Sequence, residues 1–166
     1  MCRFCVCHDP RSRLFAVCTV RGHQGEDQGV VRFLRDEAPY TDVHHHFLEP
    51  LETPLCCSLV CLKCDIAGSC FVIGTAFSTS EFEPAAGRVL VFSSDTAETI
   101  PTTLFILEMD GAVYDIAAIR ASFLVCAVNH SVHVYNTHIV DVDGQPRHAH
   151  GVLESSYCCN CCRMQA

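Results

Sequence analysis

The chain contains no tryptophan, few methionines and comparatively little charge. Asp, Glu, Lys and Arg together make up 18% of its 166 residues, and Lys and Arg number only 11 against 19 Asp and Glu, for a formal net charge of −8. Disordered chains typically combine high charge with low hydrophobicity. Nucleic-acid affinity rests largely on Lys and Arg that neutralise phosphates. The composition therefore predicts a folded protein and does not support direct nucleic-acid contact.

The sequence also lacks a long apolar run. Its longest mostly apolar stretch, residues 66–77, is shorter than the roughly 20 residues that a membrane helix needs, and it contains Gly68 and Gly74. The N-terminus lacks the apolar stretch of about 7–15 residues found in a secretory signal. We therefore expect a soluble intracellular protein without a membrane segment, in which the 14 cysteines are mostly reduced thiols.

What the sequence does contain is a strand pattern that occurs about three times. Residues 14–20, 71–77 and 122–128 are similar runs of Val, Ile, Phe, Ala and Thr, and each is followed by a second strand-like run. Recurrence at a period of roughly 50 residues is typical of repeat architectures such as propellers. Propellers close with about 4–8 blades of four strands, so a chain with about three blades corresponds to part of one.

The predicted fold is therefore all-β: a partial β-propeller of about three four-stranded antiparallel blades, at residues 1–50, 51–110 and 111–150. A Cys-rich tail of irregular structure, which we expect to be disordered, follows at 151–166. The expected strands are 3–8, 14–20, 30–34 and 41–47 in the first blade; 55–63, 69–77, 87–93 and 102–108 in the second; and 111–119, 122–128, 131–136 and 138–142 in the third.

Two segments interrupt the repeating pattern of predicted strands. Residues 21–29 are polar and rich in glycine, which predicts a flexible surface connection. Residues 78–86 are longer than a simple hairpin loop and are expected to project from a propeller face. Loops on a rigid scaffold, or the rim beside them, are where partners are usually held.

Cysteine pairs with zinc-knuckle spacing are the first candidates for chemistry. They are Cys2/Cys5, Cys61/Cys64, Cys158/Cys161 and Cys159/Cys162. The first two pairs fall in predicted strands, where residues three apart point to opposite faces, so we interpret them as small buried side chains. Chelation is geometrically open for the tail pairs, with His148 and His150 as the nearby further ligands. An unrelated or mis-spliced terminus is the alternative.

The other chemistry-bearing residues give no catalytic constellation. In a strand, His44 and His46 share a face and His45 does not, and a solvated edge strand is the simpler interpretation of this triplet. The sequence has no Gly-x-Ser-x-Gly elbow, no phosphate-binding loop and no His-Glu-x-x-His. We expect a protein that is not an enzyme, with no catalytic residue, cofactor site or metal ligand to assign. Gly74, Gly87 and Arg88 are interpreted as structural.

Three ordered segments carry a family resemblance: residues 71–76, 83–92 with its Glu-Pro-x-x-Gly-Arg stretch, and 111–116 with its Gly-Ala-Val-Tyr start. Together they resemble the family of the large subunit of the damaged-DNA-binding complex, the adaptor of cullin-4 ubiquitin ligases. This family also includes the large subunits of the cleavage-and-polyadenylation specificity factor (CPSF) and of a splicing factor 3b complex. The resemblance spans residues 1–150, is strongest over 71–136, and corresponds to part of the third propeller.

The resemblance implies a non-enzymatic scaffold that acts in protein–protein interaction. Its expected partners are substrate-receptor proteins and other subunits of a ubiquitin ligase, in the nucleus and in the DNA damage response. An RNA-processing subunit of the same family is the alternative, and a small zinc-binding protein built on the Cys and His content is a further one. Because three blades leave unpaired sheet edges, we expect the isolated chain to be poorly soluble, oligomeric or only part of the natural product.

Overall fold

The structure is a computed structural model that describes residues 5–23, 26–61, 69–78, 84–94, 100–120, 123–136 and 155–157. These residues form strands, turns and short connections. Within them, no helix is long and apolar enough to cross a membrane.

The described strands form three sheets, each four-stranded and antiparallel, and we refer to the sheets as blades 1, 2 and 3. Blade 1 contains β1 (Cys5–Asp9), β2 (Leu14–His23), β3 (Glu26–Arg35) and β4 (Asp42–Phe47). Blade 2 contains β5 (Glu52–Val60), β6 (Cys70–Phe77), β7 (Gly87–Ser93) and β8 (Thr103–Met109). Blade 3 contains β9 (Val113–Ile119), β10 (Phe123–Val128), β11 (Ser131–Asn136) and the short β12 (Ser155–Tyr157).

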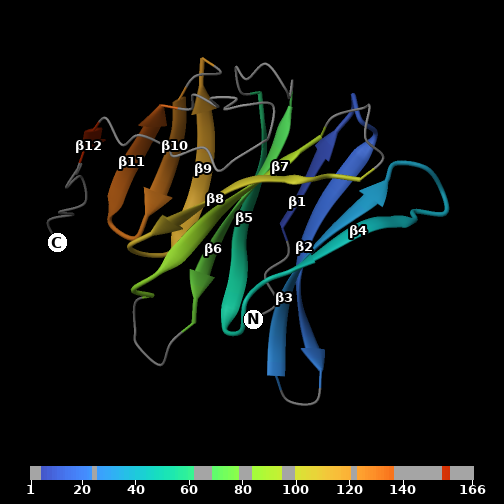
Figure 1. The fold of residues 1–166 in the computed structure, drawn as a ribbon, viewed down its shortest axis with the longest axis horizontal. Coiled ribbons are helices and arrows are strands. Elements are labelled where there is room, and N and C mark those ends of the chain that lie inside the picture. The colour runs from blue at the N-terminus through green and yellow to red at the C-terminus, as the bar shows by residue number, and fades with distance from the viewer. Residues whose placement is uncertain are drawn as a thin grey trace, which may run out of the picture.

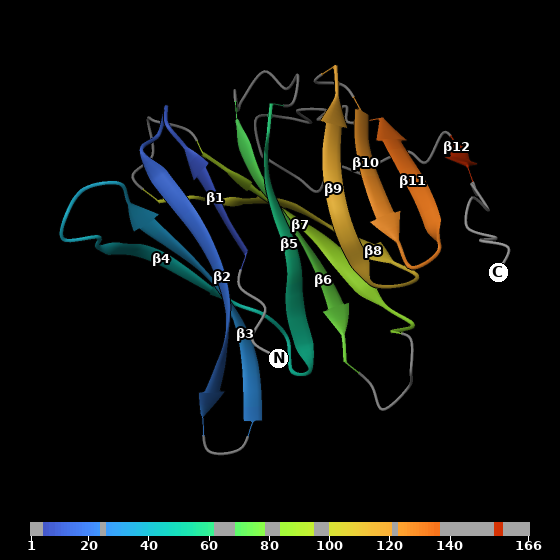
Figure 2. The ribbon, with the colours of Figure 1, turned by 180° about the vertical axis from the view of Figure 1, so that it is seen from behind.

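The blades are arranged side by side, with blade 2 between blades 1 and 3 (Figure 1). The first strand of each blade contacts the first strand of the next, because β1 packs against β5 and β5 packs against β9. Viewed from behind, the same order is visible, with β5 between β1 and β9 (Figure 2). The predicted fold class, an all-β partial propeller of about three four-stranded blades, is confirmed.

The two central strands of blade 2 show why the sequence pattern is so apolar there. Every residue of β7, and every residue of β6 except Phe77, is buried. Successive side chains of a strand point to opposite faces. One apolar run therefore contributes side chains to the core on each side of blade 2. Phe71 and Ile73 pack toward blade 1, whereas Cys70 and Val72 pack toward blade 3. The middle blade is therefore the element on which both neighbours pack.

Aromatic side chains fill the interface between blades 1 and 2. Phe33 of β3 is fully buried, with its ring 5.6 Å from that of Phe71 and 5.1 Å from that of Phe92. Both separations lie in the range favoured by tilted and edge-to-face aromatic pairs. This core is largely made of side chains from the two sheets: Leu14, Ala16, Cys18, Val31, Phe33, Leu48, Phe71, Ile73, Leu90 and Phe92.

The prediction of a flexible connection at residues 21–29 was wrong. Strands β2 and β3 continue through most of this segment and pair up to His23 and Glu26, and residues 24 and 25 lie outside the described residues. Gly29 is part of β3, and a Cβ on it would lie 2.6 Å from the backbone oxygen of Glu52. The glycine therefore permits a close approach between blades 1 and 2, a role that composition alone does not distinguish from flexibility.

The fourth strand of blade 3 also differs from the prediction. The expected strand at 138–142 lies outside the described residues. Instead Ser155–Tyr157, from the segment predicted to be an irregular tail, pairs with β11. The free edge of a strand offers backbone donors and acceptors to any extended segment. Because such pairing does not depend on which side chains are present, the amino-acid sequence does not reveal it. The predicted domain ranges stay a prediction.

Gly87 lies where neighbouring backbone segments come very close to it. A Cβ at this position would lie 2.5 Å from the carbonyl oxygen of Thr75 and would also overlap the carbonyl oxygen of Gly111. Because both obstacles are backbone atoms, Gly87→Ala is expected to destabilise the fold by about 1–3 kcal/mol. Urea unfolding followed by circular dichroism measures this cost. Thr103→Ala, at an exposed position of β8, is the control and should change stability by less than about 0.5 kcal/mol.

Candidate protein-interaction surface and the contacts that support it

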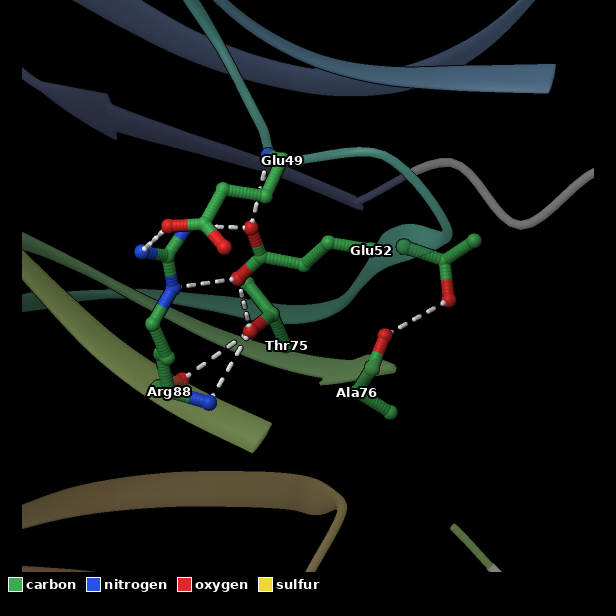
Figure 3. Close-up of polar contacts among 6 residues, drawn as sticks. Glu49, Glu52, Thr75, Ala76 and Arg88 are labelled. Atoms are coloured by element: carbon green, nitrogen blue, oxygen red, sulfur yellow. Dashed lines mark hydrogen bonds and ion pairs between the residues drawn. The ribbon is translucent and has the colours of Figure 1, made fainter. Parts of the chain in front are cut away.

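A buried ion pair lies where the connection from blade 1 enters blade 2 (Figure 3). The Glu52 side chain, at the start of β5, is completely buried, and the Arg88 side chain in β7 is 8% exposed. The Nε of Arg88 donates to Oε1 of Glu52 at 2.9 Å, and its Nη2 donates to Oε2. This two-point geometry matches the planar guanidinium to the carboxylate and gives the stronger kind of charge-assisted hydrogen bond.

Neighbouring groups satisfy the remaining polar atoms of the pair. The Thr75 hydroxyl, on β6, donates to Glu52 Oε1 at 2.6 Å and accepts from the Arg88 backbone N–H at 3.0 Å. Glu49 accepts from Arg88 Nη1 at 2.5 Å, and its own N–H donates to Glu52 Oε2 at 2.9 Å. The hydrogen bonds with Glu52 raise the pKa of Arg88, although burial opposes this. The cluster joins β5, β6 and β7 to the segment that leaves blade 1.

A second polar contact links blade 1 directly to blade 2. Asp9, at the end of β1, is 1% exposed and accepts a hydrogen bond from the Ser94 hydroxyl at 2.5 Å. It also accepts from the Arg11 backbone N–H at 3.0 Å and from the Ser12 hydroxyl at 2.9 Å. Burial by itself raises the pKa of the Asp9 carboxyl, but these hydrogen bonds outweigh it and lower the pKa overall.

Asn129 makes the equivalent link between blades 2 and 3. Its backbone has a φ of 46°, a left-handed conformation that Asn tolerates in turns. The side-chain oxygen accepts from the Ala112 N–H at 2.7 Å, and the side-chain nitrogen donates to the Pro84 carbonyl at 3.0 Å. Pro84 precedes β7 and Ala112 precedes β9, so this one side chain ties the β10–β11 turn to both blades.

The face of blade 3 that points away from blade 2 is largely apolar, and we call it the blade 3 outer face. Alternate residues of β10, Leu124 and Cys126, are buried toward blade 2. The residues between them point the other way and pair across the sheet with similar side chains, such as Val125 with Ala117 and Val134. The face consists of Ala117, Ile119, Phe123, Val125, Ala127, Val132 and Val134, with Asp115 beside Ala127.

The blade 3 outer face repeats the pattern by which blades 1 and 2 contact their neighbours. Ile119 is 51% exposed and Phe123 is 38% exposed. Large apolar surfaces that remain accessible commonly mark interaction sites. Two sheets pack face to face through such rows of alternating side chains. The blade 3 outer face can therefore pack against an apolar face of another antiparallel sheet.

The corresponding outer face of blade 1 is more polar. It carries a shallow cavity of about 300 Å³ lined by Val30, Arg32, Asp42, His45 and Phe47. Arg32 donates to both carboxylate oxygens of Asp42, and this hydrogen bonding lowers the pKa of Asp42. An ion pair this exposed contributes little to stability. Its main effect is on the distribution of charge over this face.

The histidine triplet divides as the strand geometry predicts. His45 points outward, where its Nε2 lies 3.3 Å from Asp42. The His46 ring packs edge-on against Phe92 of blade 2 at 5.1 Å, and that of His44 stacks on Phe33 at 6.1 Å. The triplet lies on an edge strand, as interpreted, because β4 is the last strand of its sheet. Only His45 is exposed, whereas His44 and His46 are half-buried with their rings against Phe33 and Phe92.

Only one member of each of the first two predicted cysteine pairs is among the described residues. Cys5 is half-buried and packs against the core between blades 1 and 2. Cys61 is exposed, so the interpretation of this residue as a buried side chain was wrong. Their partners Cys2 and Cys64 lie outside the described residues, as do all four tail cysteines. Among the residues that the structure describes, no group of three or more His, Cys, Asp or Glu side chains is placed to hold a metal ion. The tail pairs stay a prediction.

The fold and its interfaces define a partial β-propeller built for packing between sheets. Residues 31–139, from β3 to the segment after β11, match the family described as the CPSF A subunit region. Since this match covers more than half of the chain, the protein belongs to that family.

The chain is also similar to a curated relative, DNA damage-binding protein 1b of Arabidopsis thaliana. The two are 27% identical over 133 residues, which is 78% of this chain and 12% of the relative. The chain thus spans about an eighth of the length of that relative. The resemblance inferred from residues 71–76, 83–92 and 111–116 is confirmed.

Removing one member of the buried ion pair should be costly. In Arg88→Ala the carboxylate of Glu52 keeps its charge in a fully buried position, and the expected loss of unfolding free energy is about 3–5 kcal/mol. Adding Glu52→Gln to this variant removes the stranded charge and should recover part of the loss. Chemical denaturation of the single and double variants measures both effects.

The matched control is Arg32→Ala, which breaks an exposed ion pair and should cost less than about 1 kcal/mol. Equal losses for Arg32→Ala and Arg88→Ala would contradict the structural role of the buried pair. So would a double variant that is less stable than Arg88→Ala alone.

The pKa of His46 predicts a pH dependence of stability. Burial lowers this pKa, and the charges of Arg88 and His44 lower it further, against a smaller opposing effect of Glu52. Because folding favours the neutral ring, stability is expected to fall as the pH drops below about 6.5, the ordinary pKa of histidine, and through the lowered folded value. Melting temperatures between about pH 7.5 and 5 test this. His46→Gln should lose less than the wild type, whereas the exposed His45→Gln should not reduce the loss.

Proposed function

We propose that the chain is a non-enzymatic protein-interaction scaffold, a partial propeller of a cullin-4 ubiquitin ligase adaptor that recognises substrate receptors in the DNA damage response. The family match across β3 to β11 is the observation that carries this proposal. The similarity to a DNA damage-binding protein favours this branch of the family. The proposed location is the nucleus.

The proposed contact surface is the blade 3 outer face. Its apolar rows continue the alternation that buries blade against blade elsewhere in the molecule. The occupant we propose is therefore a subunit of the ligase complex that presents an apolar antiparallel sheet. Recognition of this kind depends on shape and on apolar area, and it needs no metal or cofactor. With a net charge of −8, the chain itself is not suited to binding nucleic acid.

Affinity purification of the tagged chain from nuclear extract, with quantitative mass spectrometry, tests the proposal. We expect cullin-4 ligase subunits or their substrate receptors to be enriched. In Val125→Lys a charge enters the centre of the blade 3 outer face, and this enrichment should fall at least about tenfold, a loss of roughly 1.4 kcal/mol or more. Thr103→Lys adds the same charge at an exposed position of β8 and should leave the enrichment unchanged.

Enrichment of polyadenylation or splicing factors instead would overturn the proposal in favour of an RNA-processing subunit. The description of the matching family, the CPSF A subunit region, makes that the second candidate. Recovery of neither group would overturn both. If Val125→Lys bound as well as the wild type, the scaffold function would stand and the assignment of its surface would fail.

A further inference from the structure

A cluster of cysteine thiols lies between blades 1 and 2. Cys5 and Cys7 are on β1, and Cys18 is on β2, directly opposite Cys5 in the pairing of the two strands. Cys57 is on β5, the strand of blade 2 that packs against β1. Figure 1 shows β1 next to β5 where blade 1 meets blade 2. The four thiols thus come from three strands and two blades.

One contact in the cluster joins the two blades directly. The Sγ atoms of Cys7 and Cys57 are 2.7 Å apart, and both residues are half-buried, so neither is fully shielded from solvent. A disulfide has an S–S length of about 2.05 Å. The sulfurs therefore need to move by less than an ångström to reach bonding distance.

We propose that Cys7 and Cys57 are a site of oxidative modification, at which hydrogen peroxide links blade 1 to blade 2 by a disulfide bond. The proposal requires only the packing of the two blades and is independent of the proposed function.

The chemistry balances with peroxide as the oxidant. The thiolate of Cys7 attacks one peroxide oxygen, the O–O bond breaks, and the departing hydroxide takes up the thiol proton to leave as water. The sulfur of Cys57 then attacks the resulting sulfenic acid, the S–O bond breaks, and a second water leaves with the proton of Cys57. Two thiols and one peroxide thus give one disulfide and two waters. The peroxide is reduced by two electrons, and the sulfurs supply them.

Cys18 contacts both Cys5 and Cys57. Hydrogen bonds from Cys5 and from Cys57 lower the pKa of the buried Cys18 thiol to about 5, although burial opposes this. The same contact raises the pKa of Cys57. Cys57 therefore enters the second step as a thiol, and its proton leaves with the departing water.

The bond would close a loop between residues 50 apart in the sequence. A cross-link over such a span restricts the unfolded chain, which is the usual way a disulfide stabilises a fold. Because it holds β1 against β5, the oxidised protein should resist separation of blade 1. Oxidation is therefore expected to raise the melting temperature by several degrees, and a thiol reductant should reverse the rise.

Peptide mapping of the full 166-residue chain tests the proposal. The reduced protein is treated with an equimolar amount of hydrogen peroxide, free thiols are blocked with N-ethylmaleimide, and cross-linked peptides are quantified by mass spectrometry. The expected product joins the peptide containing Cys7 to the one containing Cys57. Cys7→Ser and Cys57→Ser should each lower its yield at least tenfold.

The matched controls are neighbouring cysteines whose loss should leave the yield unchanged. Cys56→Ser removes the adjacent thiol, which points toward blade 3 and donates to the Val113 carbonyl at 3.5 Å. Cys61→Ser removes an exposed thiol outside the cluster. A cross-link within blade 1 between Cys5 and Cys18, or one that survives Cys7→Ser, would overturn the proposal. So would a wild-type protein that yields no cross-link between the two peptides.

Discussion

Arg88 and Glu52 form a buried ion pair where the chain passes from blade 1 into blade 2. A carboxylate that is fully buried is tolerated only when its charge is paired and its remaining lone pairs are satisfied. Here the carboxylate accepts from a guanidinium, a hydroxyl and a backbone N–H, and each of these donors comes from a different segment of the chain. Apolar packing between sheets is non-directional. The polar cluster fixes how the segment leaving blade 1 enters blade 2.

The same principle recurs at the two other joints. Asp9 meets Ser94 between blades 1 and 2, and Asn129 meets the carbonyl of Pro84 between blades 2 and 3. Each joint places a few directional hydrogen bonds at the end of a broad apolar interface. The blades thereby keep a fixed relation to one another, as a scaffold requires. Membership of the CPSF A subunit region family agrees with this architecture.

Most of the fold could be predicted from the sequence because strand periodicity is local. The expected strands at 69–77 and 87–93 differ from β6 and β7 by one residue at most. The glycines of residues 21–29 misled the prediction, since a glycine needed for close approach resembles one in a flexible loop. The site could not be predicted in the same way. Glu52 and Arg88 are 36 positions apart, and no local pattern marks two residues that meet only after three strands have assembled.

Blade 2, whose strands are joined by the buried ion pair, is the element on which blades 1 and 3 pack. Native-state hydrogen exchange, resolved by residue, tests this most directly, because it measures the free energy with which each strand opens. We expect the slowest exchange in β6 and β7, with blades 1 and 3 opening at lower free energy. Exchange that is slower in either outer blade than in β6 and β7 would contradict it.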